Sequence, residues 1–550
     1  MVLHFFKKIY PINKFKIVKI KDNCTSRVLF FIIILLIGVG VYKDYGIGGD
    51  EIFLQWIGQL NFSNLLEILN FNFKNDYKSK LIELSKDKHF FLWLNFSFFF
   101  EFISNNIKNL FNLNYSREIF FSRFFINFFI FFLSSIYFFF LINKRFQEKK
   151  FSYLAVTLLY LCPRIFAESF FNTKDIVFLS FFIITIYYYF ELIKKKNTKN
   201  LIIFSIVSGI LISQRIIGVL IPLIVFIIFL FDNIDKKKKL KKIILCAFFS
   251  SLIISIVFFL LMPIFWFNTL SNLKNYIQHH KIVLEQGIFL IEYWGEYIPS
   301  ITSPWNYRLV WITITIPEVL AIISFVGFFY LSIFIYKKLV KLEKKKKLWE
   351  NNDELLDTFI FSLSLIVILL LVFTWNKFNG WRHFYFSYCL IIYLGLFYLE
   401  NIKKKFFLRN MILFFLTINI LKNIFWMVNN HPHQHTYLNY YEKIFINKRF
   451  ELDYFGSSLR NDIEYVLRND QRPTINIISI GQTYLPGASK ILEEEQFKRL
   501  NFYNIKSPDY IINNYHLRFG KTETIDLKKY TKFRDLIVDN KLVSTIYKKK

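Results

Sequence analysis

The fold class follows from "VLFFIIILLIGVGVYKDYGIGGDEIFLQW", residues 28–56. Its first half, residues 28–42, is an uncharged apolar run, which is typical of a membrane-spanning helix. A glycine-rich turn follows, and it carries two adjacent carboxylates, Asp50 and Glu51, just outside the apolar run. The stretch therefore predicts a membrane protein with an acidic pair at the membrane surface.

The composition extends this prediction to the whole chain of 550 residues, because 54% of them are hydrophobic and 21% are aromatic. A formal charge of +30 in a soluble protein would suggest a nucleic-acid partner. Here the lysines and arginines gather in short loops between apolar runs, as the positive-inside rule describes. We therefore expect a lipid bilayer around the chain and no nucleic-acid partner.

The pattern of apolar runs predicts an α-helical polytopic membrane protein of about 11 transmembrane helices. An arginine in mid-hydrocarbon is costly, so the long run at 201–231 is read as two short passes broken near Gln214 and Arg215. The predicted spans are 28–42, 119–142, 152–168, 175–193, 201–231 (two passes), 243–265, 311–336, 358–375, 384–400 and 406–426.

The lysine-rich loops all fall on one side of these spans, which predicts that this side and the basic segment 1–27 are cytoplasmic. No small-residue cleavage site follows the first apolar run, so we expect a retained helix in the plasma (inner) membrane. The transmembrane domain is then 28–426, with outer loops at 43–118 and 268–308. The four cysteines form neither a disulfide framework nor a zinc-ligand spacing.

The polar region 427–550 predicts a small α/β domain on the outer, periplasmic side. We expect strands in "INIISIG" (475–481), "PDYIINNY" (508–515) and "KLVSTIYKK" (541–549). We expect one amphipathic helix in "ASKILEEEQFKRL" (488–500).

Two interpretations apply to the outward-facing acidic pair. Asp50 and Glu51 are well placed to cap an interfacial helix, whose N-terminal dipole favours negative charge. Alternatively, one carboxylate is a general base that takes the proton of an acceptor hydroxyl or amine during group transfer.

Outward-facing cations also allow two interpretations. In "FNTKDIVF", the spacing of Asn172 and Asp175 fits a helix cap, whereas Lys174 at that helix end suits anion binding. Arg215 near a span end, and Arg382 beside His383, are interfacial anchors or ligands for a lipid phosphate.

Aromatic and histidine-rich stretches complete the outward-facing candidates. The stretch 293–317, which contains Trp305 and Tyr307, is either an interfacial aromatic belt or the lining of a sugar or acceptor cleft. "HPHQH" (431–435) would place its histidines on one face of a strand, but no fourth ligand is in view, so no metal site is expected.

Taken in order, these stretches resemble the polyprenyl-phosphate-dependent glycosyltransferases of the GT-C fold, which include protein O-mannosyltransferases and aminoarabinose transferases. The acidic pair is similar to the family's Asp-Glu pair in the first outer loop. Further stretches resemble motifs of one bacterial branch: "ESFFNTKDIVF" (168–178), "SQRIIGVLIP" (213–222), "SPWNYRLVWITITIP" (303–317), "FNGWRHFYFSY" (378–388), "HPHQHTYLNYYEKIF" (431–445) and "RFELDYFGSSLRNDIEYV" (449–466).

The resemblance implies an inverting transfer of a sugar from a polyprenyl-phosphate donor to a protein, lipid or glycan acceptor on the outer face. Asp50 would be the catalytic base, Glu51 would shape the site or contact the acceptor, and Arg382, Lys174 and Arg215 would bind the donor phosphate. The chain departs from the family at "DKHFF", where the usual proline pair is missing. Candidate substrate-binding residues are Asp175, His383, Tyr385, Lys88, His89, Trp305 and Tyr307.

No cofactor is required by this chemistry, because the leaving group is not a nucleotide diphosphate; dependence on a divalent cation is left open. Two other functions are considered. A flippase for lipid-linked sugars, or a polysaccharide transporter, would also need outward cations, but not an acidic pair or an outer C-terminal domain. A structural scaffold would use every polar stretch as a cap or an anchor.

Overall fold

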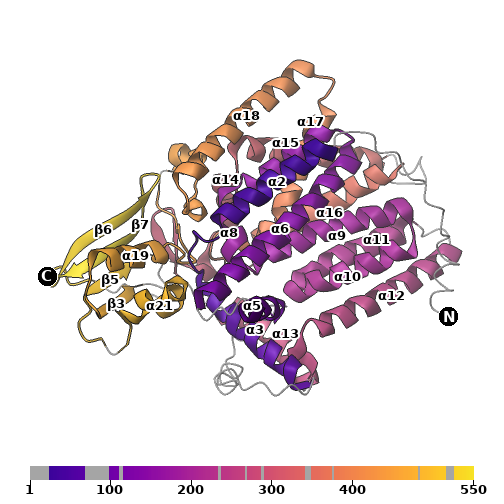
Figure 1. The fold of residues 1–550 in the computed structure, drawn as a ribbon. Coiled ribbons are helices and arrows are strands. Elements are labelled where there is room, and N and C mark those ends of the chain that lie inside the picture. Colours follow the sequence, from indigo (N-terminus) through magenta and orange to yellow (C-terminus); the bar gives the residue numbers. More distant parts are fainter. Residues whose placement is uncertain are drawn as a thin grey trace.

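The structure is a computed structural model that describes residues 24–68, 98–110, 116–232, 237–266, 269–286, 290–340, 349–374, 377–446, 448–480, 484–503, 505–515 and 525–550. Helices make up most of the molecule, and the strands of the C-terminal region gather at one end of the helical part (Figure 1). Lys88 and His89 lie outside the described residues.

Within the described residues, seven helices are long and apolar enough to cross a membrane. They are α6 (Ser116–Phe146), α9 (Asp175–Lys195), α12 (Lys237–Leu260), α15 (Glu318–Val340), α16 (Asn352–Phe373), α17 (Tyr388–Asn401) with the preceding 3₁₀ turn η5 (Arg382–Ser387), and α18 (Phe406–Asn429). Shorter apolar helices are α2 (Cys24–Val41), α10 (Thr198–Gln214) and α11 (Leu220–Asp232). The mostly helical fold is compatible with the predicted polytopic membrane protein, whereas the count of 11 spans stays a prediction.

The break predicted near Gln214 and Arg215 is confirmed. Helix α10 ends at Gln214, Arg215 is extended with φ −153° and ψ 133°, and the 3₁₀ turn η2 (Ile216–Val219) leads into α11. The chain thus changes direction at the arginine that an unbroken apolar helix would have left in hydrocarbon.

Two predicted spans are wrong as single helices. The stretch 152–168 is divided between α7 (Lys149–Tyr160) and α8 (Pro163–Phe171), which meet at an angle of 67°. The stretch 311–336 is divided between α14 (Tyr307–Thr315) and α15, with Ile316 extended before Pro317. In both cases a proline is responsible, because it has no N–H to donate and it favours extended backbone in the residue before it.

The two predicted outer loops contain structure of their own. Helices α3 (Gly49–Ile68) and α5 (Phe98–Leu110) lie within the first loop. The second contains helix α13 (Thr269–Gln286) and the antiparallel hairpin of β1 (Leu290–Tyr293) and β2 (Glu296–Pro299).

The C-terminal region contains a five-stranded mixed sheet with the strand order β4-β3-β5-β7-β6. Its strands are β3 (Ile475–Ile480), β4 (Leu500–Asn501), β5 (Tyr510–Asn513), β6 (Tyr530–Val538) and β7 (Lys541–Lys549). Strand β3 runs parallel to β4 and β5, and β7 runs antiparallel to β5 and β6. The three strands predicted from sequence are confirmed, while an independent α/β domain stays a prediction.

The single amphipathic helix predicted at 488–500 is wrong. That stretch is divided among α20 (Leu485–Ala488), the 3₁₀ turn η8 (Ser489–Ile491) and α21 (Glu494–Lys498). The division has a local cause, because the side chains of Glu493 and Gln496 form a capping box that starts a new helix.

Helix α19 (Leu459–Asn469) packs a buried carboxyl group against the sheet. Asp462 accepts a hydrogen bond from the Ser544 hydroxyl at 2.6 Å. Burial raises the pKa of Asp462 to about 7, although the Ser544 hydrogen bond opposes the shift.

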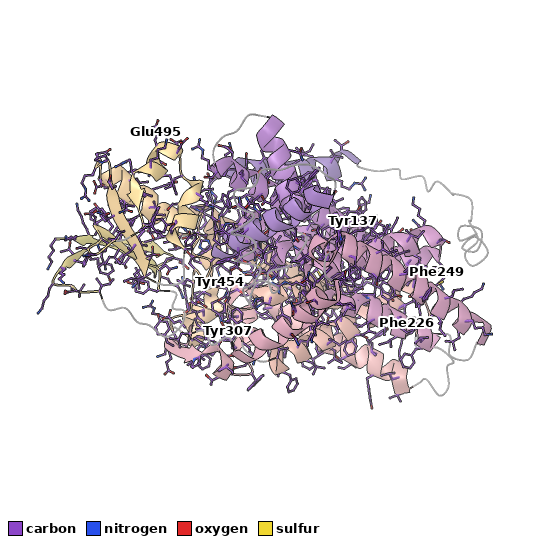
Figure 2. The ribbon with its side chains drawn as sticks, turned by 90° about the horizontal axis from the view of Figure 1, so that it is seen from below. Tyr137, Phe226, Phe249, Tyr307, Tyr454 and Glu495 are labelled. Atoms are coloured by element: carbon purple, nitrogen blue, oxygen red, sulfur yellow. The ribbon has the colours of Figure 1, made fainter. Side chains whose placement is uncertain are left out.

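The C-terminal region is tied directly to the turn that precedes Asp50. The N–H of Gly49 donates to the Phe455 carbonyl at 2.8 Å, and Arg460 donates to the Tyr45 carbonyl at 2.9 Å. A Cβ at Gly46 would overlap the Ser457 carbonyl oxygen, so only glycine permits this approach. Tyr454 lies where the helices meet the C-terminal region (Figure 2).

A second close approach joins two spanning helices. Helix α15 packs against α17, and a Cβ added to Gly327 would overlap the Leu394 carbonyl oxygen. The helix backbones can therefore come this close only because Gly327 has no side chain.

Candidate active site

Asp50 lies in the first turn of α3, immediately after the glycine turn. Its Oδ2 accepts a hydrogen bond from Nη1 of Arg382 at 2.5 Å, and the side chain is 26% exposed. Within the described part of the chain, Oδ1 accepts no hydrogen bond. Asp50 is therefore held in place through one oxygen and presents the other.

Arg382 begins η5 after a turn in which Asn379 and Gly380 have φ values of 53° and 62°. The buried Tyr307 hydroxyl accepts the N–H of Gly380 at 3.1 Å, so Tyr307 supports this turn. The Arg382 guanidinium lies 4.7 Å from the centre of the Phe455 ring. Contacts from both sides thus orient Arg382 towards Asp50.

Glu51 has a different environment from its neighbour, because its side chain is fully buried. Its Oε2 accepts a hydrogen bond from Nε of Arg123 at 3.0 Å, and its Oε1 accepts from the N–H and the hydroxyl of Thr173. Arg123 also pairs with Glu101. Glu51 therefore anchors α3 to α6 and to the turn before α9, while its predicted contact with the acceptor stays a prediction.

The turn before α9 shows that Asn172 caps the helix. The Asn172 side-chain oxygen accepts the N–H of Asp175 at 3.0 Å, and its amide donates to the Asp175 carboxylate at 3.0 Å. Asp175 also forms an ion pair with Arg215. The cap thus fixes the position of Lys174, which lies between Asn172 and Asp175.

Lys174 is half-buried, and the charges of Arg215, Asp50 and Arg382 are close enough to act on it. Burial and the nearby charge of Arg215 lower the pKa of Lys174 to about 7; Asp50 opposes this shift and Arg382 adds to it. The structure therefore brings Lys174, Arg215 and Arg382 together around Asp50.

Two of these cations have unsatisfied donors. The Nε groups of Arg215 and Arg382 are buried and have no hydrogen-bond partner within the described residues. A buried donor without a partner is costly, so these groups favour an anionic ligand that would accept their hydrogen bonds.

Arg308 and Lys377 are additional cations that the sequence interpretation did not identify. Arg308 lies on α14, donates to the Thr374 hydroxyl and covers the Phe384 ring at 5.0 Å. Burial and the Arg308 charge lower the pKa of Lys377. Arg308 also acts electrostatically on His383. The sequence signal that could have identified Arg308 is its position inside the aromatic motif 303–317.

The remaining candidates differ in their access to this site. His383 is half-buried next to Phe378, with the ring centres 5.1 Å apart. Tyr385 is buried and donates to Glu168 at 2.7 Å, so it belongs to a buried hydrogen-bond network with Glu168 and Tyr454. Trp305 is 63% exposed at the surface.

The histidine stretch does not form the predicted strand. Its centre is the 3₁₀ turn η6 (Gln434–Thr436), because the chain turns directly after α18 and Pro432 has no N–H for a strand ladder. His431 pairs with Asp44 at 2.9 Å. No group of three or more His, Cys, Asp or Glu residues in the described ranges is arranged to hold a metal ion. The expectation that no cofactor is required stays a prediction.

Asp453 holds the loop that contacts the glycine turn. It accepts hydrogen bonds from the Ser457 N–H at 3.1 Å and from the Ser458 N–H at 2.9 Å. Burial opposes its ionisation, but His435 and Ser458 together hold the pKa of Asp453 below its usual range. This charged anchor fixes the loop whose Phe455 carbonyl positions Gly49.

The fold is compatible with a multi-pass membrane protein, and its candidate site is the Asp50 carboxylate with Arg382, Lys174 and Arg215 around it. Residues 116–266 match the sequence model of the family described as dolichyl-phosphate-mannose-protein mannosyltransferase. The match covers 151 of the 550 residues and, over them, confirms the resemblance to GT-C glycosyltransferases found in the motifs. The matched segment includes Lys174 and Arg215, whereas Asp50 and Arg382 lie outside it. Among curated proteins, none matches the chain.

Proposed function

We propose that this protein transfers a sugar from a polyprenyl-phosphate-linked donor to an acceptor on the outer face of the membrane, with inversion at the anomeric carbon. One observation carries the proposal: Asp50 contacts Arg382 at 2.5 Å, and both residues, together with Arg215, are close enough to act electrostatically on Lys174. This arrangement supports a reaction that requires a base and phosphate-binding cations at one site.

The cations serve the donor phosphate. Lys174, Arg215 and Arg382 bind this phosphate, and the unsatisfied Nε groups of the two arginines supply hydrogen bonds to it. When the glycosidic bond breaks, the bonding electrons pass to the phosphate oxygen and the polyprenyl phosphate leaves with one additional negative charge. Cations fixed around that oxygen lower the barrier by stabilising the charge as it develops.

Asp50 serves the acceptor. A hydroxyl or amine of the acceptor attacks the anomeric carbon from the face opposite the phosphate, and its proton passes to Oδ1 of Asp50. Because Arg382 contacts both Asp50 and the phosphate, it sets the distance between base and leaving group, which accelerates the reaction through orientation.

Two measurements test this proposal. The first is a density map of the full-length protein in lipid nanodiscs with polyprenyl phosphate added. We expect phosphate density against Arg382 and Lys174, within a sugar's width of the Asp50 carboxylate. Phosphate bound elsewhere would contradict the proposed site.

The second measurement is sugar transfer by Asp50→Asn. We expect turnover to fall about 100-fold or more, while polyprenyl-phosphate binding persists, because the change removes the base but keeps the shape of the side chain. Asp526→Asn makes the same change at an exposed position of the C-terminal region, and as the matched control it should retain transfer. Unchanged turnover in Asp50→Asn would exclude Asp50 as the base.

A further inference from the structure

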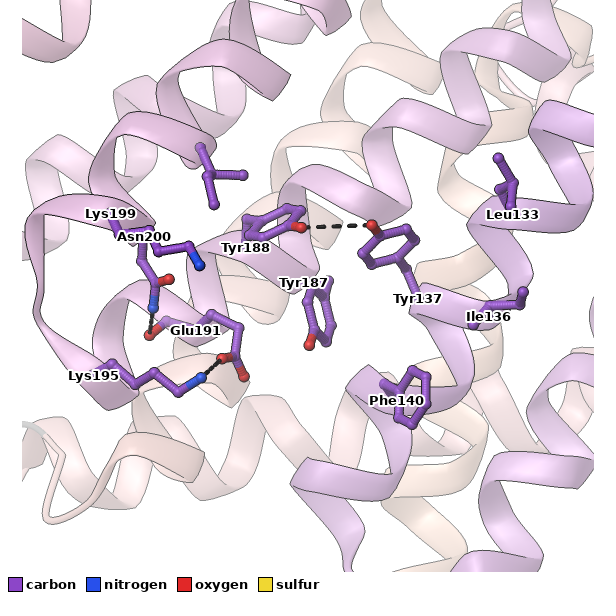
Figure 3. Close-up of a pocket in the computed structure, with 11 residues that line it drawn as sticks. Leu133, Ile136, Tyr137, Phe140, Tyr187, Tyr188, Glu191, Lys195, Lys199 and Asn200 are labelled. Atoms are coloured by element: carbon purple, nitrogen blue, oxygen red, sulfur yellow. Dashed lines mark hydrogen bonds and ion pairs between the residues drawn. The ribbon is translucent and has the colours of Figure 1, made fainter. Parts of the chain in front are cut away.

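A cavity of about 530 Å³ opens between α6, α9 and α10 (Figure 3). Its walls combine tyrosines, lysines, a carboxylate and aliphatic side chains. They are formed by Leu133, Ile136, Tyr137, Phe140, Tyr187, Tyr188, Glu191, Lys195, Lys199, Asn200 and Ile203.

This cavity is separate from the Asp50 site. Helix α9 begins at Asp175 beside that site, and Glu191 in the cavity wall lies 16 residues further along the same helix. At 1.5 Å per residue this is about 24 Å, which approaches the roughly 30 Å thickness of a bilayer's hydrocarbon core. The cavity therefore lies at the opposite membrane face, which the lysine distribution predicts to be cytoplasmic.

The polar half of the cavity carries excess positive charge. Lys195 contacts the Glu191 carboxylate at 2.6 Å, and Lys144 pairs with the same carboxylate. One carboxylate thus faces two ammonium groups, and Lys199 pairs with no carboxylate among the described residues. This half of the cavity favours an anion.

Phenol groups also line the cavity. Lys144 donates to the Tyr187 hydroxyl at 2.8 Å, and the hydroxyls of Tyr137 and Tyr188 lie 3.5 Å apart. Figure 3 shows the Tyr137 and Tyr188 hydroxyls facing each other across the cavity. Ammonium and phenol donors around one space suit a ligand with several acceptor oxygens, such as a phosphate.

The other half of the cavity is apolar. On the α6 side, Leu133 and Ile136 contribute aliphatic side chains, and Leu133 is exposed on the outer surface of this helix. A ligand that satisfies both halves carries a charged head and a hydrocarbon chain.

We propose that this cavity binds the phosphate headgroup of an anionic membrane lipid on the predicted cytoplasmic side. The phosphate lies among Lys195, Lys199 and the tyrosine hydroxyls, while the acyl chain follows Leu133 and Ile136 into the bilayer. The site is distinct from the transfer site and does not depend on the proposed function. Basic pockets between membrane helices bind lipid headgroups by the same combination of charge and shape.

The test is native mass spectrometry of the detergent-solubilised full-length protein titrated with phosphatidylglycerol, compared with phosphatidylcholine. We expect selective retention of phosphatidylglycerol. The double variant Lys195→Gln, Lys199→Gln should bind it about 10- to 30-fold more weakly, since each basic side chain near an anionic lipid contributes on the order of 1 kcal/mol. The matched control Lys404→Gln, Lys405→Gln removes the same charge from another exposed lysine cluster and should bind normally.

A shape variant separates a built site from general surface attraction. Ile136→Trp fills the cavity without changing any charge, so it should abolish selective retention. Undiminished binding in Ile136→Trp, or equal losses in the two lysine double variants, would overturn the proposal. Displacement of the lipid by millimolar inorganic phosphate would overturn the lipid assignment and point to a soluble phosphate ligand. Asp50→Asn should retain the lipid, which keeps this test independent of the transfer reaction.

Discussion

Raising the pH from 6 to 9 should weaken the binding of a polyprenyl-phosphate sugar, because Lys174 loses its proton within that range. Burial and the Arg215 charge lower its pKa to about 7. The ammonium form is therefore about 90% populated at pH 6 and about 10% populated at pH 8. The cation that attracts the donor phosphate is present below pH 7 and disappears above it.

The magnitude follows from proton linkage. If only the charged lysine binds phosphate well, affinity falls by up to about tenfold for each pH unit above 7. The loss ends when the full contribution of the charged hydrogen bond, about 1.5–3 kcal/mol, has disappeared, which corresponds to roughly 10- to 150-fold in affinity.

The assay is equilibrium binding of a polyprenyl-phosphate sugar to the protein in nanodiscs between pH 6 and 9. This ligand is a phosphodiester, so its own charge stays constant over that range. Lys174→Arg should bind equally at every pH, because an arginine remains protonated, and Lys174→Gln should bind weakly throughout. A flat profile for the unmodified protein, or a slope that persists in Lys174→Arg, would refute this reasoning.

Three further predictions concern stability. Glu51→Gln leaves Arg123 without a full counter-charge in a buried network, so we expect the free energy of unfolding to fall by about 3–5 kcal/mol and the yield of folded protein to decrease. Thermal unfolding in detergent measures this change. An unchanged Tm would argue against an anchoring role for Glu51. Asp462→Asn should raise the free energy of unfolding more at pH 8 than at pH 4, by at most about 4 kcal/mol, and the Tm should follow. The reason is that the raised folded-state pKa makes the carboxyl group increasingly destabilising as the pH rises from about 4 to 7. The same difference at both pH values would exclude ionisation as the cause. Gly327→Ala should lower the Tm because its methyl group overlaps the backbone of α17, whereas the control Gly40→Ala meets no atom within 4 Å and should not.

Sequence patterns predicted those features that leave a local signal. Apolar runs located most of the described helices, and the cost of a charge in hydrocarbon located the break at Arg215. The sequence predicted that Lys174, Arg215 and Arg382 all face the outer side of the membrane, which grouped them as one candidate site. The structure brings them together around Asp50.

Other features leave no such signal. Adjacent residues on a helix point about 100° apart, so sequence alone does not show that Asp50 is partly exposed while Glu51 is buried. The bends at Pro163 and Pro317 were overlooked because the surrounding residues remain apolar. The approach of Gly46 to Ser457 joins segments with no common periodicity, so no local pattern predicts it.

The contact between the glycine turn and the loop after Asp453 also sets an order of events during biosynthesis. Gly46 and Ser457 are 411 residues apart, which corresponds to about 20–80 s of translation at 5–20 residues per second. For most of this interval Asp50 exists without Arg382, and the Phe455 carbonyl that positions Gly49 becomes available only at its end. A nascent chain cannot assemble the Asp50 site until it has extended beyond residue 460, even if every predicted membrane helix has already been inserted.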